Sequence, residues 1–536
     1  MQEIFNKMKE TFGVSENTNV NYQASICKVG EIIPIEGSEH LCKTIVNGYT
    51  IVVSNDLKQG DIVIYFPVET AICNEFLSAN NLYELHYASR NKNRDAVLAL
   101  KEKAEEAKKA GDMKEYNRLY SEAKSMVGFF SDKARVRIIK LRGVYSEGFI
   151  TPIDSMVQYD ASLAEINWEE FVGTRFDCVN GLPFCWKYIP PMKPIEAVPC
   201  GRQSFFRKRM KRLRASDLLI PGQFEFHYDT EALAPKIDLL KPDDIVTITV
   251  KCDGTSVILS NVQRKRELSL WEKIKKKIGL KVKNEVIYDN IWSSRKVIKN
   301  DFFHKNGQQQ HYYGVDILGC AERVFGQYIP HGMTIYGEIV GYLEHSDIMI
   351  QANHDYGCKP GQWKLMPYRI TETDSDGNKK EWNVLDVDRW THNLVNEHPE
   401  LEQHILYLNI LYHGRMADLY PDLDISCHWH ENLLERLKND KENFLMEEKE
   451  PMCHLYEDKL SAIQERIEEN RKKNKSTEYW DKKYAEVDKF RAPREGIVIR
   501  IDDDIMPRAW KLKTNAHYEK ERQMHDDGVS DIEEQN

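Results

Sequence analysis

The chain alternates between two kinds of sequence that cannot form the same structure. Short β-branched runs such as "KTIVNGYTIVV" and "GDIVIYFPV" follow one another between turn-forming residues from about residue 22 to 179, which is typical of a small β-barrel. Residues 88–126 interrupt them with a stretch rich in Ala, Lys, Glu and Leu, broken at "AGD". We therefore predict an N-terminal β domain over residues 1–200 with a helical insertion at about 88–126.

A second region of mixed α and β character begins near Phe224. Strand-like runs include "DDIVTITVKCDGTSVIL", "MTIYGEIVGYL" and "LMPYRITETDSDGNKKEWNVL", in which "DSDGN" predicts a hairpin turn. Residues 391–484 have Leu and Ile at helical spacing with dense mixed charge, which predicts a second helical insertion. Strands return in "EGIVIRID" and "RAWKLKT". We predict an α+β fold, with a second domain over 218–515 and an acidic tail at 516–536.

Basic residues are concentrated between the two expected domains, in "GRQSFFRKRMKRLRASD" at 201–217. This segment is either a solvated linker or a phosphate-binding strip. Its basic residues surround Phe205 and Phe206 and are Arg207, Lys208, Arg209, Lys211, Arg212 and Arg214.

Composition limits the partners of the protein. A net charge of −10 over 536 residues means that any nucleic-acid surface must be local. The 11 cysteines include no C-x-x-C pair, which favours a reducing compartment over a disulfide framework or a zinc site. No apolar run approaches membrane-spanning length, and the first residues lack a signal-peptide core. We expect a cytoplasmic protein with no membrane partner.

Charged residues lie inside several of the apolar runs. Lys251 and Asp253 interrupt "TVKCDGTSVIL", Glu338 lies in "YGEIVG", and Glu495 begins "EGIVIR". In "WKLKT", Lys511 and Lys513 are two residues apart, so on a strand both ammonium groups point to the same face. "WSSRK" adds Arg295. One interpretation of Lys251 and Asp253 is an ordinary solvent-exposed turn, and the other is a reactive site.

Nucleotidyl transfer uses these groups together. A lysine attacks the α-phosphate of a nucleoside triphosphate, and it must first lose a proton, which burial and neighbouring cations favour. Mg²⁺ prefers oxygen ligands, and Asp253, Glu338 and Glu495 are the candidate metal ligands. Gly254 and Gly337 would let the backbone approach a nucleotide closely.

These segments, in this order, resemble the conserved motifs of the covalent nucleotidyltransferase superfamily of polynucleotide ligases and capping enzymes. "KCDG", "SSRK", "YGEIVG", "PYRIT", "EGIVIR" and "WKLK" resemble motifs I, Ia, III, IIIa, IV and V. The chain is most similar to the fifth family of ATP-dependent RNA ligases, which also resembles it in "IIPIEGSEHL", "KLRGVYSEGFITPI" and "FHYDT". The resemblance implies an N-terminal OB-like domain, a nucleotidyltransferase domain of antiparallel sheets and helices, and sealing of RNA 3′-OH and 5′-phosphate ends.

The resemblance also implies roles for individual residues, with ATP and Mg²⁺ or Mn²⁺ as cofactors and nicked or broken RNA as partner. Lys251 would be the nucleophile that carries AMP, and Lys511 and Lys513 would grip the α-phosphate. Glu338 would contact the ribose or a metal-bound water, Glu495 would help to hold the metal, Arg295 would engage phosphates, and Tyr368 would stack on adenine. Many relatives place Arg or Asn two residues after the motif I glycine, whereas this chain has Ser256, a weaker hydrogen-bonding side chain.

Several residues have an ordinary structural interpretation beside the functional one. Tyr368 is an adenine platform or a sheet-packing residue, and Arg295 is a phosphate ligand or a surface arginine. His227 and Asp229 in "FHYDT" touch substrate or make structural hydrogen bonds. "CHWHE" at 427–431 offers too few ligands for zinc.

Function and the division of labour between domains follow as hypotheses. The alternatives to an RNA ligase are a DNA ligase or capping-type enzyme, and a catalytically inactive RNA-binding scaffold. We expect the N-terminal domain to bind RNA, because small barrels often do so through basic and aromatic residues. The candidates are Arg135, Arg137, Lys140 and Arg142 in "ARVRIIKLRG", for which a solvated strand face is the alternative.

Overall fold

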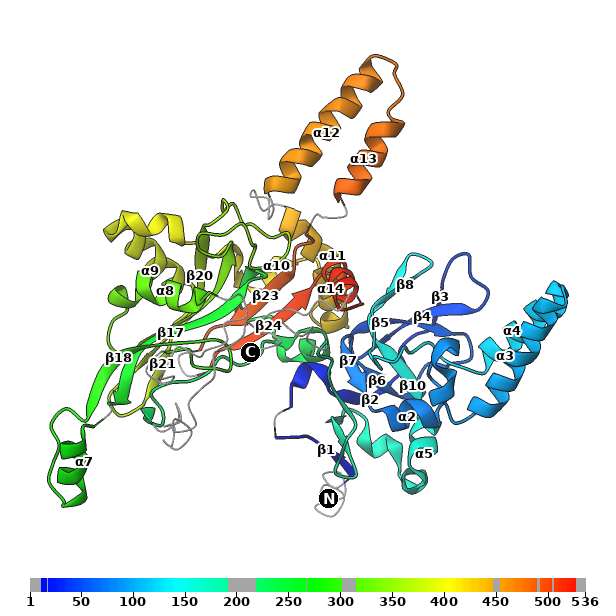
Figure 1. Ribbon diagram of the computed structural model, residues 1–536, viewed down its shortest axis with the longest axis horizontal. Helices are drawn as coiled ribbons and strands as arrows, with labels where there is room; N and C mark the ends of the chain where they lie inside the picture. The colour runs from blue at the N-terminus through cyan, green and yellow to red at the C-terminus, as the bar shows by residue number, and fades with distance from the viewer. Residues whose placement is uncertain are drawn as a thin grey trace, which may run out of the picture. The chain divides into compact units, whose positions relative to one another are not determined.

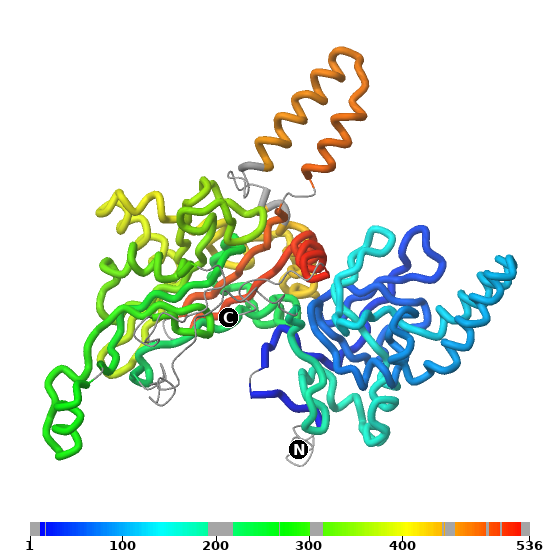
Figure 2. Tube along the Cα trace, viewed as in Figure 1, coloured from blue at the N-terminus to red at the C-terminus, as the bar shows by residue number. Residues whose placement is uncertain are grey.

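The computed structural model describes residues 11–190, 218–300, 315–446, 454–488 and 492–526, except for positions 17, 267, 504 and 505. The chain divides into two compact units, which Figures 1 and 2 show in colours that follow the sequence. Unit 1 comprises Met1–Pro190, Glu231–Asp238 and Tyr518–Asp527, and unit 2 comprises Pro191–Thr230, Leu239–His517 and Gly528–Asn536. The predicted basic linker at 201–217 lies outside the described residues.

Unit 1 consists of small antiparallel sheets. Its described strands form the orders β10-β6-β2-β11, β3-β4-β5, β1-β12-β13, β14-β7 and β8-β9. β2 and β6 are buried almost throughout, because their β-branched and aromatic side chains face apolar clusters on both sides of the sheet. The strands are β1 Phe12–Gly13, β2 Ala24–Lys28, β3 Ile33–Pro34, β4 Leu41–Val46, β5 Tyr49–Ser54, β6 Ile62–Phe66, β7 Thr70–Ile72, β8 Ile139–Leu141, β9 Val144–Ser146, β10 Phe149–Pro152, β11 Arg175–Phe176, β12 Cys178–Val179, β13 Leu182–Pro183, β14 Cys185–Lys187 and β15 Glu231–Ala232.

A helical hairpin interrupts the strands of unit 1, as the sequence predicts. α3 and α4 occupy the Ala- and Lys-rich segment, and Asp112 caps α4 by accepting a hydrogen bond from the amide of Glu115 at 3.0 Å. The left-handed Gly111 provides the break between the two helices. The helices of this unit are α2 Asn74–Ala79, α3 Arg94–Lys109, α4 Met113–Ser125 and α5 Asp154–Tyr159, with 3-10 helices η1 Val20–Tyr22, η2 Leu85–Arg90, η3 Ala161–Glu165 and η4 Trp168–Phe171.

Unit 2 contains two antiparallel sheets. One runs β24-β23-β16-β22 and the other β18-β17-β19-β20-β21. β16 and β17 are consecutive in sequence but belong to different sheets, so residues 252–254 form the crossing between them. The strands are β16 Ile245–Lys251, β17 Thr255–Lys265, β18 Val286–Ser293, β19 Met333–Gly341, β20 Trp363–Thr373, β21 Lys379–Glu381, β22 Ile410–Arg415, β23 Gly496–Ile501 and β24 Arg508–Lys513.

The main core of unit 2 lies between its five-stranded sheet and two helices. Apolar residues of β17, β19 and β20 pack against α8 and α9, which cover the same face of the sheet (Figure 1). The predicted "DSDGN" hairpin is confirmed between β20 and β21, where Thr373 pairs with Lys379. The helices of unit 2 are α7 Leu270–Lys277, α8 Ile317–Phe325, α9 Val384–Glu397, α10 Met416–Leu419, α11 Trp429–Met446, α12 His454–Lys472 and α13 Glu478–Asp488, with η8 Gly326–Tyr328 and η9 Pro399–His404. Two further helices, α14 Asn515–Asp526 and η6 Ala234–Leu239, lie mostly in unit 1.

Two segments differ from the sequence-based expectation. Residues 391–484, expected to be helical, include β22, which pairs with β16 over Ile245–Thr249 and so extends the first sheet. Its sequence "ILYHGR" is too short for its strand character to stand out beside long helical flanks. Residues 516–536, expected to be an acidic tail, begin with most of α14. The coarse expectation of mixed α and β structure with antiparallel sheets is confirmed, and the OB-like barrel remains a prediction.

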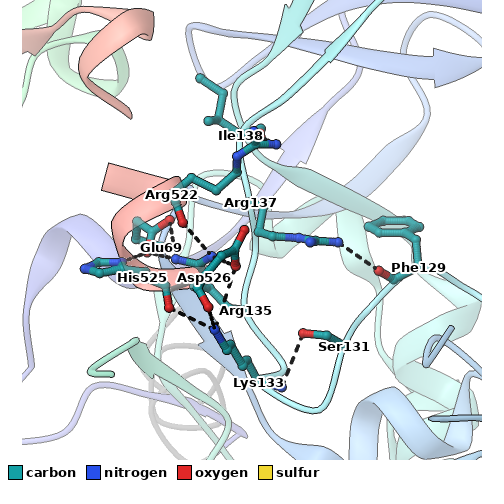
Figure 3. A network of polar contacts seen from close by, with 10 residues as sticks. All are labelled: Glu69, Phe129, Ser131, Lys133, Arg135, Arg137, Ile138, Arg522, His525 and Asp526. Carbon is teal, nitrogen blue, oxygen red and sulfur yellow. Dashed lines mark hydrogen bonds and ion pairs between the residues drawn. The ribbon is translucent and has the colours of Figure 1, made fainter. Parts of the chain in front are cut away.

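The sequence suggests that Arg135 lies on an RNA-binding surface or on a solvated strand face, and the structure shows neither environment. Arg135 is 3% exposed, and its guanidinium contacts Glu69 at 3.0 Å and Asp526 of α14 at 2.6 Å (Figure 3). His525 Nδ1 lies 2.7 Å from the same Glu69 carboxylate, and Lys133 donates to the carbonyl of His525 at 2.8 Å. Arg135 is therefore part of a buried ionic network, whereas Lys140 and Arg142 are exposed.

Among the described residues, none of the helices has the length and apolar character needed to cross a lipid bilayer.

Candidate active site

Two lysines lie in one cross-strand row at the end of β16. Lys251, the last residue of β16, pairs with Gly496 of β23, and Gly496 pairs in turn with Lys513 of β24. Side chains at paired positions of neighbouring strands lie on the same face of a sheet. The antiparallel register thus places Lys251 and Lys513 on one face with a glycine between them.

Glycine is the only residue type that fits at position 496, between the two lysines. A Cβ at this position would lie 2.2 Å from the carbonyl oxygen of Leu512 and 2.8 Å from the Cα of Lys513. One row further along, Val498 pairs with both Thr249 and Lys511. Because Lys511 and Lys513 are two residues apart on β24, the predicted shared face of these lysines is confirmed.

Glu495 is the anion that holds this cluster together. Its carboxylate is 2.8 Å from the Nζ of Lys251 and 3.1 Å from the Nζ of Lys513, and its side chain is 6% exposed. Burial would raise the pKa of Glu495, but Lys251, Lys513 and His517 hold that pKa well below its usual range. Glu495 is therefore an ionised carboxylate bound by two ammonium groups.

The lysine with a lowered pKa is not the one that the sequence suggests. Burial, Lys513 and Lys251 lower the pKa of Lys511 to about 7. Burial also acts to lower the pKa of Lys251, but the adjacent Glu495 outweighs it and the pKa of Lys251 is raised. The expectation that neighbouring cations leave Lys251 partly deprotonated is thus wrong for this state, because its strongest contact is with a carboxylate.

Asp253 and Gly254 form the crossing between the two sheets. A Cβ on Gly254 would lie 2.7 Å from the carbonyl oxygen of Ile339, so a glycine is required here by the neighbouring strand, and the expected approach to a nucleotide stays a prediction. The amide of Asp253 donates to the Tyr356 hydroxyl at 2.8 Å, and Gln351 Nε2 donates to the carbonyl of Gly254 at 3.1 Å. The segment that follows Lys251 is therefore held by side chains from residues 351–356.

The three carboxylates that the sequence suggests as metal ligands do not gather into one group. Asp253 lies 3.9 Å from Nε2 of the buried His354, and Glu495 is bound by the two lysines. Glu338 is 8% exposed in β19, opposite Ser256, and it raises the pKa of Lys251. Within the described parts of the chain, no three His, Cys, Asp or Glu side chains are placed to hold a metal ion together.

Arg295 and Tyr368 lie near the lysine cluster and have protein partners. Arg295 Nη1 donates to Asp229 at 2.6 Å, and Asp229 in turn acts on the pKa of Lys511. The ring of Tyr368 lies edge-on to that of His227, with centroids 5.4 Å apart. Burial, Arg369 and Arg295 lower the pKa of His227 to about 3, so this imidazole is neutral at physiological pH.

Sequence reasoning missed three residues that support the site. His517 Nε2 lies 3.8 Å from Glu495, and Tyr356 and His354 hold the segment after Lys251. His517 follows Lys513 by four residues in the first turn of α14, beyond the strand pattern of "WKLKT". Tyr356 and His354 could not be identified from the sequence. Their role depends on the segment after Lys251, which is far away in the chain and approaches them only in the fold.

The protein is similar in structure to variants of a Naegleria gruberi RNA ligase. One with ATP and Mn has 17% sequence identity and a TM-score of 0.47, over 93% of this chain and 99% of that chain. Another with ATP and Mn has 16% identity and a TM-score of 0.46, over 95% and 100% of the two chains. An apo variant has 16% identity and a TM-score of 0.47, over 93% and 98%. No family model and no curated protein matches the sequence.

Proposed function

We propose that this protein is an ATP-dependent RNA ligase that joins RNA 3′-OH and 5′-phosphate ends through a lysyl-AMP and then an RNA-adenylate. The observation that carries the proposal is the row Lys251–Gly496–Lys513 with Glu495 bound to both lysines. The row unites the sequence segments that resemble motifs I, IV and V. Three lysine side chains on one sheet face with one shared carboxylate would suit the charge of a triphosphate better than a balanced structural ion pair would.

In the first step, Nζ of Lys251 would form a bond to the α-phosphorus of ATP. The bond from that phosphorus to the bridging oxygen breaks, and pyrophosphate leaves with the electron pair. Lys511 and Lys513 would bind the phosphate oxygens on which negative charge develops. In the second step the 5′-phosphate of RNA would take AMP from Lys251, and in the third the 3′-OH would displace AMP.

Lys251 must lose a proton before it can attack. Its Nζ lies 2.8 Å from the ionised carboxylate of Glu495. The same contact keeps the ammonium form favourable in this state. Lys251 would become more nucleophilic if Glu495 were drawn away from it, because burial and Lys513 would then lower the pKa of Lys251 against the weaker opposing effect of Glu338.

The donor set fits a metal ion that is shared with the substrate. Mg²⁺ in nucleotide sites is usually held by one or two carboxylates, waters and phosphate oxygens, so a closed set of protein ligands is not required. Glu495 and Glu338 would hold Mg²⁺ or Mn²⁺ here, with Asp253 as the third candidate. When bound, the metal would neutralise charge on the phosphates.

Arg295, Tyr368 and unit 1 would serve the rest of the substrate. We propose that Arg295 exchanges Asp229 for a phosphate, and that Tyr368 stacks on adenine beside the neutral His227. Residues 1–200 would be an OB-like module that positions RNA, and residues 218–515 the nucleotidyltransferase domain with insertions at 88–126 and 391–484. The corresponding role is the repair of broken or nicked RNA in the cytoplasm.

Incubation with α-³²P-labelled ATP or GTP, followed by a denaturing gel, tests the chemistry. We expect an acid-labile label from ATP alone, formed only with Mg²⁺ or Mn²⁺ present. Sealing of nicked RNA, nicked DNA and hybrid duplexes then separates the ligase classes. Preferred labelling from GTP would favour a capping-type enzyme, equal sealing of DNA would favour a DNA ligase, and no label from either nucleotide would favour an inactive scaffold.

A further inference from the structure

The hairpin of β17 and β18 carries at its tip a helix with no buried residue. α7 lies at the far end of this ribbon, away from the five-stranded sheet, as Figures 1 and 2 show. The tip also holds some of the most exposed apolar side chains in the described chain. They are Leu270 at 79%, Trp271 at 76%, Ile278 at 67%, Leu280 at 55% and Ile274 at 51% exposed.

Capping signals at both ends favour the folding of α7. Ser269 and Glu272 form a reciprocal capping box at the start of the helix. At its end, Gly279 adopts a φ of +81°, and the amide of Leu280 donates to the carbonyl of Lys275 at 2.9 Å. The helix therefore forms without packing its apolar residues, which remain available to a partner.

The apolar and the charged side chains of α7 lie on different sides of the helix. At about 100° per residue, Leu270, Ile274, Ile278 and Trp271 fall within roughly 100° of one another. Lys273 and Lys277 lie beside one edge of this stripe and Lys275 beside the other. Glu272 and Lys276 lie opposite, where Glu272 pairs with Arg266 of the ribbon and Lys276 with Glu285. The polar side of α7 is thus bound to its own ribbon, and the apolar side is flanked by lysines.

We propose that the tip of this hairpin, residues 270–283, binds the surface of a membrane that contains anionic lipids. Trp and aliphatic side chains suit the boundary between head groups and acyl chains, and flanking lysines suit anionic head groups. The tip has six lysines, at 273, 275, 276, 277, 281 and 283, in a chain with a net charge of −10. RNA phosphates would attract these lysines but would leave the exposed Leu and Ile side chains in water, so a lipid surface fits the whole tip better.

This proposal revises the sequence-based expectation of no membrane partner. That expectation rested on the absence of a long apolar run, which concerns spanning segments and not interfacial ones. The negative surface potential of the cytoplasmic leaflet provides the charge that the lysines require. The inference is independent of the proposed ligase activity, because no residue of the tip belongs to the lysine cluster.

Flotation of the full-length protein with vesicles tests the proposal. Vesicles of phosphatidylcholine are compared with vesicles that contain about 30% phosphatidylserine, at low and high NaCl. We expect binding to the anionic vesicles only, weakened by salt. The variant Trp271→Glu/Ile274→Glu should lose this binding. Lys273→Glu/Lys275→Glu/Lys277→Glu should weaken it by roughly a hundredfold or more, at about fivefold for each lysine.

Matched controls separate the tip from general surface effects. Tyr479→Glu on α13 also removes a largely exposed side chain, and Lys472→Glu/Lys473→Glu/Lys475→Glu removes three exposed lysines elsewhere. Both should bind vesicles like the parent, and circular dichroism should show every variant folded. Vesicle binding that survives the tip substitutions would overturn the proposal, as would no binding to anionic vesicles. Loss of RNA binding in filter assays, with vesicle binding unchanged, would reassign the tip to RNA.

Discussion

Each unit of the protein contains a buried cluster of charges, and the two clusters are built differently. In unit 1, Arg135 contacts both Glu69 and Asp526, so the fixed charge of a guanidinium is matched by carboxylates. In unit 2, Lys251 and Lys513 share the single carboxylate of Glu495, and Lys511 beside them has a pKa of about 7. Removing one partner from the balanced network leaves an uncompensated buried charge, whereas lysines that share one carboxylate would attract an anion in the function proposed above.

The largest expected effect is on activity and comes from Lys251→Ala. Covalent labelling with AMP should fall below detection, because no other lysine of the cluster ends β16 beside Glu495. The free energy of unfolding should change less than in Arg135→Ala, because the buried Glu495 keeps Lys513 as its partner at 3.1 Å. Gel labelling and urea denaturation measure the two effects. Persistent labelling of this variant would show that Lys251 is not the nucleophile.

For Arg135→Ala we expect the opposite result, a large loss of stability with no loss of activity. This change leaves the buried Glu69 without its guanidinium partner, which typically costs about 3–5 kcal/mol of stability. The fraction of folded protein that labels itself with AMP should be unchanged at a temperature where the variant is folded. Comparison with Arg135→Met/Glu69→Leu controls for the lost charge, and this double variant should be the more stable of the two. Equal stability of the single variant and the parent would contradict a structural role for the network.

The pH dependence of ATP binding tests whether the charge on Lys511 contributes to the site. At its pKa of about 7, half of the molecules carry a charged Lys511 at neutral pH. Phosphate favours the charged form, so ATP binding should take up a proton and weaken as pH rises above 7, by at most about tenfold per unit. Calorimetry in buffers of different ionisation enthalpy measures this uptake. Lys511→Arg, which stays charged, should bind ATP with a flat pH profile between pH 7 and 9.

The smallest effect is expected for Arg118→Ala. Arg118 pairs with Glu115 and Glu122 on the exposed face of α4, where water already solvates all three groups. The denaturation midpoint should not move measurably, although two ion pairs are lost as in the Arg135 variant. A shift as large as that of Arg135→Ala would show that burial is not what distinguishes the networks.

The strands that carry the site could be predicted from sequence, because charged residues inside "TVKCDG", "YGEIVG" and "WKLKT" interrupt otherwise apolar β runs. Register then determines which of these charges meet, and a strand pattern does not contain the register. That Lys251 and Lys513 flank Gly496, 17 residues before Lys513, follows from pairing alone. The pKa order of Lys251 and Lys511 depends on which lysine contacts Glu495, which is again a matter of three-dimensional placement.

The alternation of charged and apolar residues also gives a wrong prediction where a partner that is distant in sequence buries the charge. Arg135 alternates with apolar residues as an exposed strand residue would, but its partners are Glu69 and a helix almost 400 residues away. The same long separation explains why α14 was expected to be a tail. Its sequence "NAHYEKERQMHD" has little apolar character, and it is held by hydrogen bonds and ion pairs such as Tyr145 with Glu519 at 3.0 Å.

The network of Figure 3 has a consequence for how the protein is made. Unit 1 takes its first residues from Met1–Pro190 and its last from Tyr518–Asp527, so the ribosome synthesises nearly all of unit 2 between them. Domains otherwise tend to fold in the order in which they emerge. Here a nascent chain carries Arg135 and Glu69 for most of its synthesis before His525 and Asp526 exist. The first unit can therefore be completed only after residues 239–517 of the second have been translated. A chain cut short within that range lacks the contacts of Arg135 with Asp526 and of Glu69 with His525.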